Sequence, residues 1–185
     1  MRIIVAVTGA SGSIYARLVL EGLLASREVE RIGLIVSRRG KEVAAWEGIE
    51  FPQDPRIERF DNDDMFSSPA SGSARWDAMV IVPCSMGCVG RTAAGISGDL
   101  IARAADVMLK EGRTLIVVPR ETPLNLIHLR NLTTLAEAGA VVMPASPSFY
   151  SRPADLEAAC RTVTDRILAR LGIETARYEW GNKNI

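Results

Sequence analysis

The chain has 185 residues, in which 22 basic side chains balance 22 acidic ones. Zero net charge and a pI near 6.6 exclude the broad basic surface that nucleic acids and anionic membranes require, so we expect neither partner. A single histidine, with cysteines at a spacing unlike that of zinc ribbons, argues against a bound metal. The 48% apolar share indicates one domain with a real core, and no apolar run approaches the roughly 20 residues of a membrane span.

Apolar runs alternate with amphipathic stretches along the chain. Strands are expected where apolar residues follow one another, at 3–7, 32–36, 57–60, 79–82, 115–118 and 141–143. Helices are expected where the apolar spacing is helical, at 14–24, 41–46, from 86 to a break near 95–98, and at 99–110, 124–138 and 154–171. This alternation predicts a single domain, 1–185, built as a three-layer α/β fold with an open, doubly wound parallel sheet of the Rossmann or flavodoxin kind.

The two chain ends and the cysteine count add to this picture. The first seven residues are too short for a signal peptide and are expected to form a strand. Three cysteines, an odd number, argue against a disulfide framework and predict a reducing, cytoplasmic setting. The tail, 172–185, is expected to be extended.

Ligands of open α/β sheets bind at the carboxyl ends of the strands, so the segments that follow strands are the candidate sites. After the first strand, the small residues 9–13 allow backbone amides to approach an anion at a helix N-terminus. The segment is not G-x-G-x-x-G, because position 14 is Ile, and it lacks the Gly-Lys-Ser/Thr of a P-loop. A phosphate or flavin contact and a plain helix cap by Ser11 or Ser13 both remain open.

Two further strands end in polar segments. After 79–82, Ser85 and the amides that follow it suit a helix cap that holds an anion, while Cys84 and Cys88 are interpreted as small buried hydrophobes. After 115–118, Arg120 offers the paired donors that suit a phosphate, and Glu121 beside it suits proton transfer. The alternative for this second segment is a capping box that starts the next helix at Thr122.

Three other features allow a purely structural interpretation as well as a functional one. Phe149 and Tyr150, on a proline-bounded loop, suit either a pocket wall or a packed loop. The spacing of Glu47 alone favours a solvated helix face. His128 has apolar neighbours, so a core or interface histidine is favoured over a catalytic base.

Taken together and in this order, several of these segments resemble the UbiX-type flavin prenyltransferases. That family was formerly described as aromatic-acid decarboxylase small subunits, and it belongs with the homo-oligomeric flavin-containing Cys decarboxylases. The resemblance covers nearly the whole chain. The segments that carry it are 8–12 (TGASG), 83–87 (PCSMG), 103–111 (RAADV and LKE), 120–124 (RETPL) and 149–150 (FY).

The resemblance implies an enzyme that joins a dimethylallyl group from dimethylallyl monophosphate to N5 and C6 of reduced FMN, without a metal. Its product, prenylated FMN, would serve UbiD-type decarboxylases. The resemblance also implies a homododecamer with its sites at subunit junctions.

The resemblance assigns roles to residues by position. Those implied to contact FMN are Gly9, Ala10, Ser11, Ser37, Ser85, Met86, Gly87, Cys88 and Arg120. Those implied to hold the substrate phosphate are Lys110, Tyr150 and Arg166. Those implied to act in catalysis are Ser11, Glu47, Glu121, which handles protons, and Trp180, which covers the site from the tail. Cys88 departs from the family, since many relatives have Thr there.

Two alternatives come from other classes of protein. A flavin-dependent peptidyl-cysteine or phosphopantothenoylcysteine decarboxylase would need a catalytic histidine upstream of residues 123–128, and His128 is the only histidine. A non-catalytic, flavodoxin-like FMN carrier would need no phosphate site beyond that of FMN, whereas Lys110, Arg120 and Glu121 suggest one.

Overall fold

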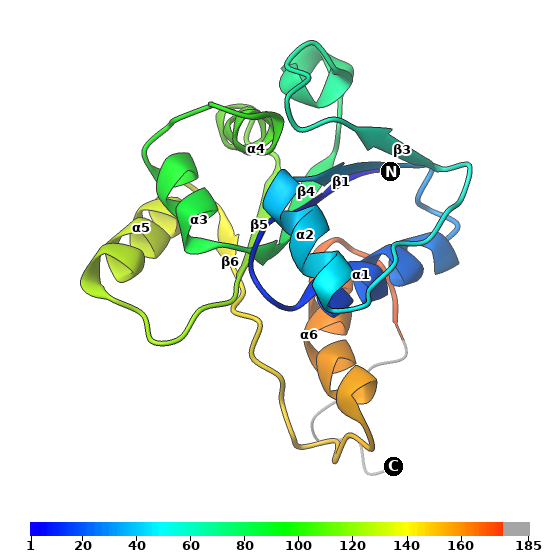
Figure 1. Ribbon diagram of the computed structural model, residues 1–185. Coiled ribbons are helices and arrows are strands. Elements are labelled where there is room, and N and C mark those ends of the chain that lie inside the picture. Colours follow the sequence, from blue (N-terminus) through cyan, green and yellow to red (C-terminus); the bar gives the residue numbers. More distant parts are fainter. Residues whose placement is uncertain (176–185) are drawn as a thin grey trace.

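A computed structural model of the chain describes residues 1–175 as six parallel strands between two helical layers (Figure 1). The strands are β1 (Arg2–Val7), β2 (Arg31–Val36), β3 (Ile57–Phe60), β4 (Ala78–Cys84), β5 (Thr114–Pro119) and β6 (Val141–Val142). Their order across the sheet is β3-β2-β1-β4-β5-β6, and every neighbouring pair is parallel. The predicted α/β fold and all of its predicted strands are confirmed.

The helices also lie where the sequence predicts them. They are α1 (Ser13–Ala25), α2 (Arg38–Trp46), α3 (Met86–Ala93), α4 (Leu100–Lys110), α5 (Leu126–Glu137) and α6 (Leu156–Arg170). Short 3-10 turns, η1 (Ser68–Ala70) and η2 (Gly72–Ala74), occupy the loop before β4. The break expected near 95–98 separates α3 from α4, which begins after the capping side chain of Asp99.

The sheet is buried on both faces, which explains its uninterrupted apolar strands. In β1, alternate residues point to opposite layers. Ile3 and Val5 pack in the layer of α1 and α6, whereas Ile4 and Ala6 pack in the layer of α3 and α4. Trp76 closes the second layer: its side chain is 1% exposed and its ring meets Phe60 edge to face. The two helical layers cover the faces of the sheet, and the loops that follow the strands lie at its edge.

Helices α1 and α6 pack closely against each other. A Cβ atom on Gly22 would collide with the Leu168 side chain, so α1 can approach α6 only because residue 22 is glycine. Farther along the pair, Arg17 donates to Glu157 at 2.8 Å, and Arg161 donates to Glu21 at 3.2 Å. These contacts fix the position of α6 on its face of the sheet.

The start of α5 differs from the prediction. Its cap is Asn125, whose Oδ1 accepts from the amide of His128 at 2.8 Å, and not Thr122. The residues after Pro123 do not become helical until Leu126. His128 is part of this cap and partly exposed, so it does not lie in the core of the chain, and the interface position stays a prediction. Because only Leu135 of α5 is fully buried, the apolar neighbours of His128 mostly face outward.

Candidate functional site

The candidate site lies where the strand order reverses direction, between β1 and β4. Open parallel sheets bind ligands in the crevice at such a point, outside the carboxyl ends of the strands. We call the turns gathered there the strand-end rim. The rim consists of residues 8–13 after β1, 37–40 after β2, 84–88 at the end of β4 and 120–121 after β5.

Thr8 joins the turn after β1 to the turn after β4. Its hydroxyl donates to the carbonyl oxygen of Pro83 at 2.8 Å and accepts from the amide of Ser85 at 2.7 Å. The Thr8 amide also donates to Pro83, at 3.2 Å. The side chain is 4% exposed. Sequence reasoning placed Thr8 in a motif but gave it no role, because its partners are distant in sequence.

Arg120 joins the turn after β5 to both of the others. Its amide donates to the carbonyl of Cys84 at 3.3 Å, and its Nε donates to the carbonyl of Ser11 at 3.0 Å. The guanidinium group therefore lies over the loop after β1, where the sequence predicted a ligand. The carboxylate of the next residue, Glu121, is exposed and accepts from the amide of Thr122 at 2.9 Å.

Glu47 occupies the N-terminus of α1. Its Oε1 accepts from the amide of Gly12 and its Oε2 from the amide of Ser13, both at 2.7 Å. The N-cap is Gly12, at φ 113°, and no side chain of its own caps the helix. Of the two alternatives for this turn, the helix cap by Ser11 or Ser13 is therefore wrong, as is the solvated face that spacing alone favoured for Glu47. The cause is tertiary: α2 runs back past the loop, and the residue that caps its C-terminus, Glu47, reaches the start of α1.

The hydrogen bonds to Glu47 determine its charge state. Burial alone would raise the pKa of its carboxyl group, but the Ser11 hydroxyl and the amides of Gly12 and Ser13 outweigh burial and hold the pKa below its usual value of 4.5. Glu47 is therefore a carboxylate at neutral pH. Since this internal anion takes the first amides of α1, a bound phosphate must find its donors elsewhere on the rim.

Helix α2 begins at the rim and fits tightly against β1. The Ser37 hydroxyl accepts from the amide of Gly40 at 3.0 Å, and the Ser37 amide donates to Val7 at 2.9 Å. A Cβ atom on Gly9 would lie 2.5 Å from the Cβ of Arg39. Glycine at position 9 is thus what allows α2 to reach the turn after β1 and to deliver Glu47.

Helix α3 offers the open amides that α1 lacks. The first amides of an α-helix have no partner within the helix. At α3, the Ser85 amide is held by Thr8 and the Cys88 amide donates to the Ser85 hydroxyl at 3.4 Å. Within residues 1–175, no acceptor partners the amides of Met86 and Gly87. The N-terminus of α3 is therefore the anion-binding position that the geometry supports.

The two cysteines of this segment lie beneath that position. Cys84 and Cys88 are both fully buried, as predicted, and both are free thiols. The hydrogen bond to Cys88, together with burial, raises the pKa of the Cys84 thiol well above its usual value of 9.0. Arg91, which pairs with Asp99 at 3.1 Å, lies close enough to act on both thiols, a basic neighbour that sequence spacing did not reveal.

One chain does not bring all of the predicted residues together. Lys110 ends α4 and pairs with Glu111, whose side chain lies against Gly72, before β4 begins. Arg166 is exposed on α6, on the opposite face of the sheet. Tyr150 is 70% exposed in the loop before α6. Trp180 lies outside the described residues.

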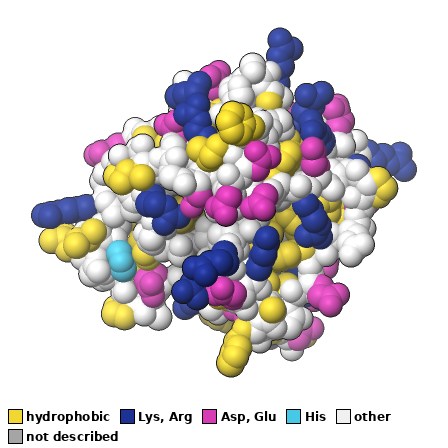
Figure 2. Space-filling view, turned by 45° about the horizontal axis from the view of Figure 1, so that its top comes forward, with side chains coloured by type: hydrophobic (Ala, Val, Ile, Leu, Met, Phe, Trp, Pro, Cys, Tyr) yellow, Lys and Arg dark blue, Asp and Glu magenta, His cyan; other side chains and the backbone are white. Residues whose placement is uncertain are grey.

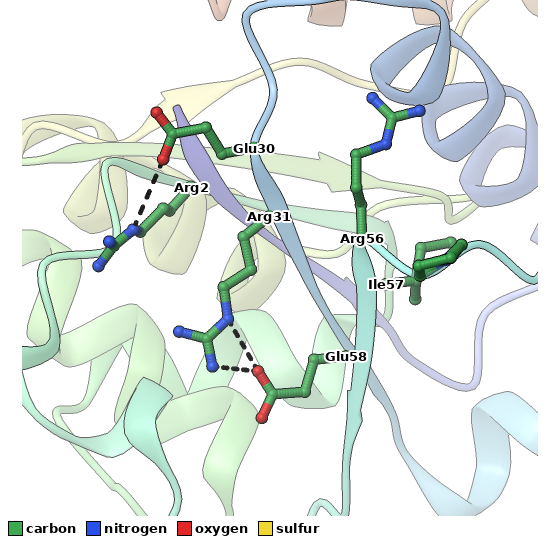
Figure 3. Close-up of a pocket in the computed structure, with 7 residues that line it drawn as sticks. Arg2, Glu30, Arg31, Arg56, Ile57 and Glu58 are labelled. Atoms are coloured by element: carbon green, nitrogen blue, oxygen red, sulfur yellow. Dashed lines mark hydrogen bonds and ion pairs between the residues drawn. The ribbon is translucent and has the colours of Figure 1, made fainter.

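A shallow pocket lies at the opposite edge of the sheet, where β1, β2 and β3 begin (Figure 3). Its charged side chains satisfy one another: Arg2 pairs with Glu30 at 4.0 Å, and Arg31 pairs with Glu58. Arg56 donates to the carbonyl of Leu24 at 2.7 Å, at the end of α1. Because the carboxylates of Glu30 and Glu58 also line it, this pocket is a poorer anion site than the rim.

The carboxylate of Glu47 at the N-terminus of α1 should make the stability of the protein depend on pH. Replacing Glu47 by Gln should cost about 1 kcal/mol of unfolding free energy at neutral pH, because a charged acceptor is lost from two amides. A folded-state pKa below 4.5 means that this difference is fully present above pH 4.5 and vanishes as the pH falls through the lower value.

Urea unfolding of both proteins from neutral to acidic pH measures the difference. The matched control is Glu42→Gln, which alters an exposed carboxylate of α2 whose ion pair is with Arg39 on the same helix. A Glu47→Gln difference that stays constant with pH, or that equals the control, would contradict the account.

Comparisons with known proteins agree with this geometry. The family model described as Flavoprotein matches residues 1–171. The flavin prenyltransferase UbiX of Methanocaldococcus jannaschii is 43% identical over 185 residues, which cover 98% of this chain and 99% of that protein. A dodecameric FMN-dependent UbiX-like decarboxylase from Escherichia coli O157:H7 superposes with a TM-score of 0.88, at 34% identity, over 97% of this chain and 99% of that one.

A second solved structure contains ligands. It is AnUbiX (PadA1) in complex with FMN and dimethylallyl pyrophosphate, with a TM-score of 0.85 and 35% identity over 97% of this chain and 98% of that one. The similarity spans the sheet and the turns of the strand-end rim alike. The chain belongs to the Flavoprotein family, and within it to the UbiX-type flavin prenyltransferases.

Proposed function

We propose that the protein joins the dimethylallyl group of dimethylallyl monophosphate to N5 and C6 of reduced FMN. The observation that carries this proposal is the division of the rim into a closed and an open anion position. Glu47 closes the N-terminus of α1, while the amides of Met86 and Gly87 stay open at α3. Arg120 and Glu121, in the turn after β5, place a cation and a carboxylate next to these two anion positions.

In this proposal the rim holds FMN through short polar groups. The open amides at α3 and the Ser85 hydroxyl face the flavin phosphate, as the helix N-terminus favours a negative charge there. Ser37 and the Gly9–Ser11 backbone contribute from the turns on the other side. Arg120, already fixed by Ser11 and Cys84, contacts the flavin ring. The Cys88 side chain is buried, so this residue contributes to the turn through its backbone amide, which donates to the Ser85 hydroxyl.

The chemistry requires compensation of charge and transfer of protons. When the C–O bond of the donor breaks, phosphate leaves with the electron pair, and cationic groups lower the barrier to its departure. Lys110 and Arg166, with the Tyr150 hydroxyl, are proposed for this task. Forming the N5 bond releases the N5 proton, and ring closure releases the C6 proton while the prenyl alkene gains one. Glu121, exposed at the rim, is proposed to exchange these protons with the substrates.

Glu47, Ser11 and Trp180 complete the proposed catalytic set. The Ser11 hydroxyl lies close enough to the Glu47 carboxylate to lower its pKa, so a proton on that hydroxyl has an acceptor beside it. Trp180 is proposed to cover the substrates as part of a closing tail, which would keep water from quenching an allylic cation.

The proposed phosphate site requires more than one copy of the chain. Lys110 and Arg166 lie on helices that cover opposite faces of the sheet, away from the rim. In addition, α5 exposes large apolar side chains that a partner would cover, and hydrophobic side chains gather around the histidine in Figure 2. The exposed apolar residues of α5 are Leu126, Ile127 and Leu129. We propose a homo-oligomer, a dodecamer like its solved relative.

The setting of the reaction follows from its reactants. Reduced FMN needs a reducing compartment, and the three free, buried thiols suit the cytoplasm. The product is proposed to pass to a UbiD-type decarboxylase. None of the helices in residues 1–175 is long and apolar enough to cross a membrane. No cluster of three metal-ligating side chains occurs there either, and the proposed reaction uses no metal.

Turnover tests the proposed function directly. The wild-type protein, incubated anaerobically with reduced FMN and dimethylallyl monophosphate, should yield a flavin heavier by C5H8 together with free phosphate. Parallel reactions with the diphosphate identify the preferred donor. An unchanged flavin mass with both donors would refute the proposal.

The role of Glu121 gives a second prediction. Glu121→Gln should bind FMN as wild type does, because the carboxylate lies outside the anion position, yet turn over about 100-fold or more slowly for lack of a proton acceptor. Flavin fluorescence measures the binding, and phosphate release measures the rate. Glu137→Gln, an exposed carboxylate at the end of α5, is the control. Full activity in Glu121→Gln would remove this residue from the mechanism.

Mixing two inactive variants tests whether sites are shared between chains. Glu121→Gln and Arg166→Ala are each expected to be inactive. If the two residues of a site come from different copies, equal mixing with subunit exchange should restore about a quarter of the wild-type activity. The matched control is a mixture of Glu121→Gln with a Glu121→Gln, Arg166→Ala double variant, which must stay inactive. Inactivity of the first mixture after proven exchange would place both residues on one chain.

A further inference from the structure

We propose that Thr8 is a positioning residue for the phosphate end of the flavin, acting through Ser85 at the start of α3. The inference rests on the proposed function, because it assumes that the open amides of α3 receive the FMN phosphate. Thr8 itself is buried and has no free donor to offer a ligand. Its effect therefore has to pass through the groups that it holds.

The hydroxyl of Thr8 is unusual in this core. The buried polar residues within residues 1–175 are Thr8, Ser13, Thr92 and Thr164. A threonine hydroxyl donates one hydrogen bond and can accept others. Thr8 uses both abilities across the sheet, donating to Pro83 at 2.8 Å and accepting from Ser85 at 2.7 Å, 75 and 77 residues along the chain.

The partner of Thr8 is the residue that sets the start of α3. Ser85 is the N-cap: its hydroxyl accepts from Cys88, and its amide is the donor that Thr8 holds. The two amides that follow in the chain, those of Met86 and Gly87, are the open ones. Holding the Ser85 amide against Thr8, the residue that follows β1, thus fixes the backbone from which the open amides project.

A second link makes the effect of Thr8 separable from the fold. The Thr8 amide donates to the carbonyl of Pro83 at 3.2 Å, and β1 pairs with β4 over four residues upstream. Both remain when the side chain changes. Loss of the hydroxyl alone leaves the Ser85 amide without its acceptor in a buried place, which displaces the cap and the amides next to it.

The experiment compares FMN with riboflavin, which has the same ring without the phosphate. Thr8→Val keeps the shape of the side chain and removes both hydrogen bonds. We expect its affinity for FMN to fall about tenfold, while its affinity for riboflavin changes less than twofold. Thr8→Ser, which keeps the hydroxyl, should bind FMN within about twofold of wild type. Quenching of flavin fluorescence measures all of these affinities.

Thr164→Val is the matched control. Thr164 is also buried, but within residues 1–175 its hydroxyl makes a single hydrogen bond, a 3.4 Å donation to the carbonyl of Arg161 in the same helix. This variant should bind FMN as wild type does. A loss of stability that both valine variants share therefore cannot explain a loss of FMN affinity that only Thr8→Val shows.

The outcomes are distinct. Equal weakening of FMN and riboflavin by Thr8→Val, or no weakening at all, would overturn the role of Thr8 while leaving the proposed function standing. A wild-type protein that binds FMN no better than riboflavin would instead refute the phosphate site itself and both proposals with it. Should Thr8→Val fail to fold, Thr8→Ser decides: tenfold loss of FMN affinity in that variant overturns the proposal.

Discussion

The carboxylate of Glu47 at the N-terminus of α1 is the interaction on which the arrangement of the site depends. A helix N-terminus after the first strand of such a sheet ordinarily attracts a phosphate. In this protein the position is filled by an internal anion, 2.7 Å from each of two amides. Glu47 thereby holds the loop after β1 in one conformation. The amides that remain open to a phosphate are those at the N-terminus of α3.

The other contacts of the rim follow from this choice. Thr8 and Arg120 tie the turns after β1, β4 and β5 to one another at distances between 2.7 and 3.3 Å. These links join the Thr8 and Arg120 side chains and amides to backbone groups of turns that directly follow the strands, so little freedom is left to lose when a ligand binds. The result is a rim with an open anion position at α3, a cation beside it and a carboxylate on either side.

The sequence was sufficient to predict much of this. Continuous apolar strands and helical spacing gave the fold, because burial on both faces of a parallel sheet leaves that pattern in the chain. The cap of α3 was also predictable, since Ser85 is only three residues from the amide that it accepts. The burial of Cys84 and Cys88 followed from residue type alone.

Contacts between segments that are distant in the chain could not be predicted from the sequence. Glu47 looks like a surface residue until α2 is folded back on α1, 35 residues earlier. Thr8 gains its role from Pro83 and Ser85. The cap of α5 was misplaced because Thr122 and Asn125 both belong to the preferred N-cap residue types, and the path of the chain after Pro123 decides between them. The separation of Lys110 from the rim likewise appears only in three dimensions.

The most direct measurement is the hydrogen exchange of individual backbone amides, by NMR, in the wild-type protein with and without FMN. The account predicts that Gly12 and Ser13 exchange slowly without FMN, because Glu47 already holds them, and that FMN leaves them unchanged. The amides of Met86 and Gly87 should exchange faster without FMN and become protected when it binds. Protection by FMN at Gly12 and Ser13, with none at Met86 and Gly87, would contradict the account.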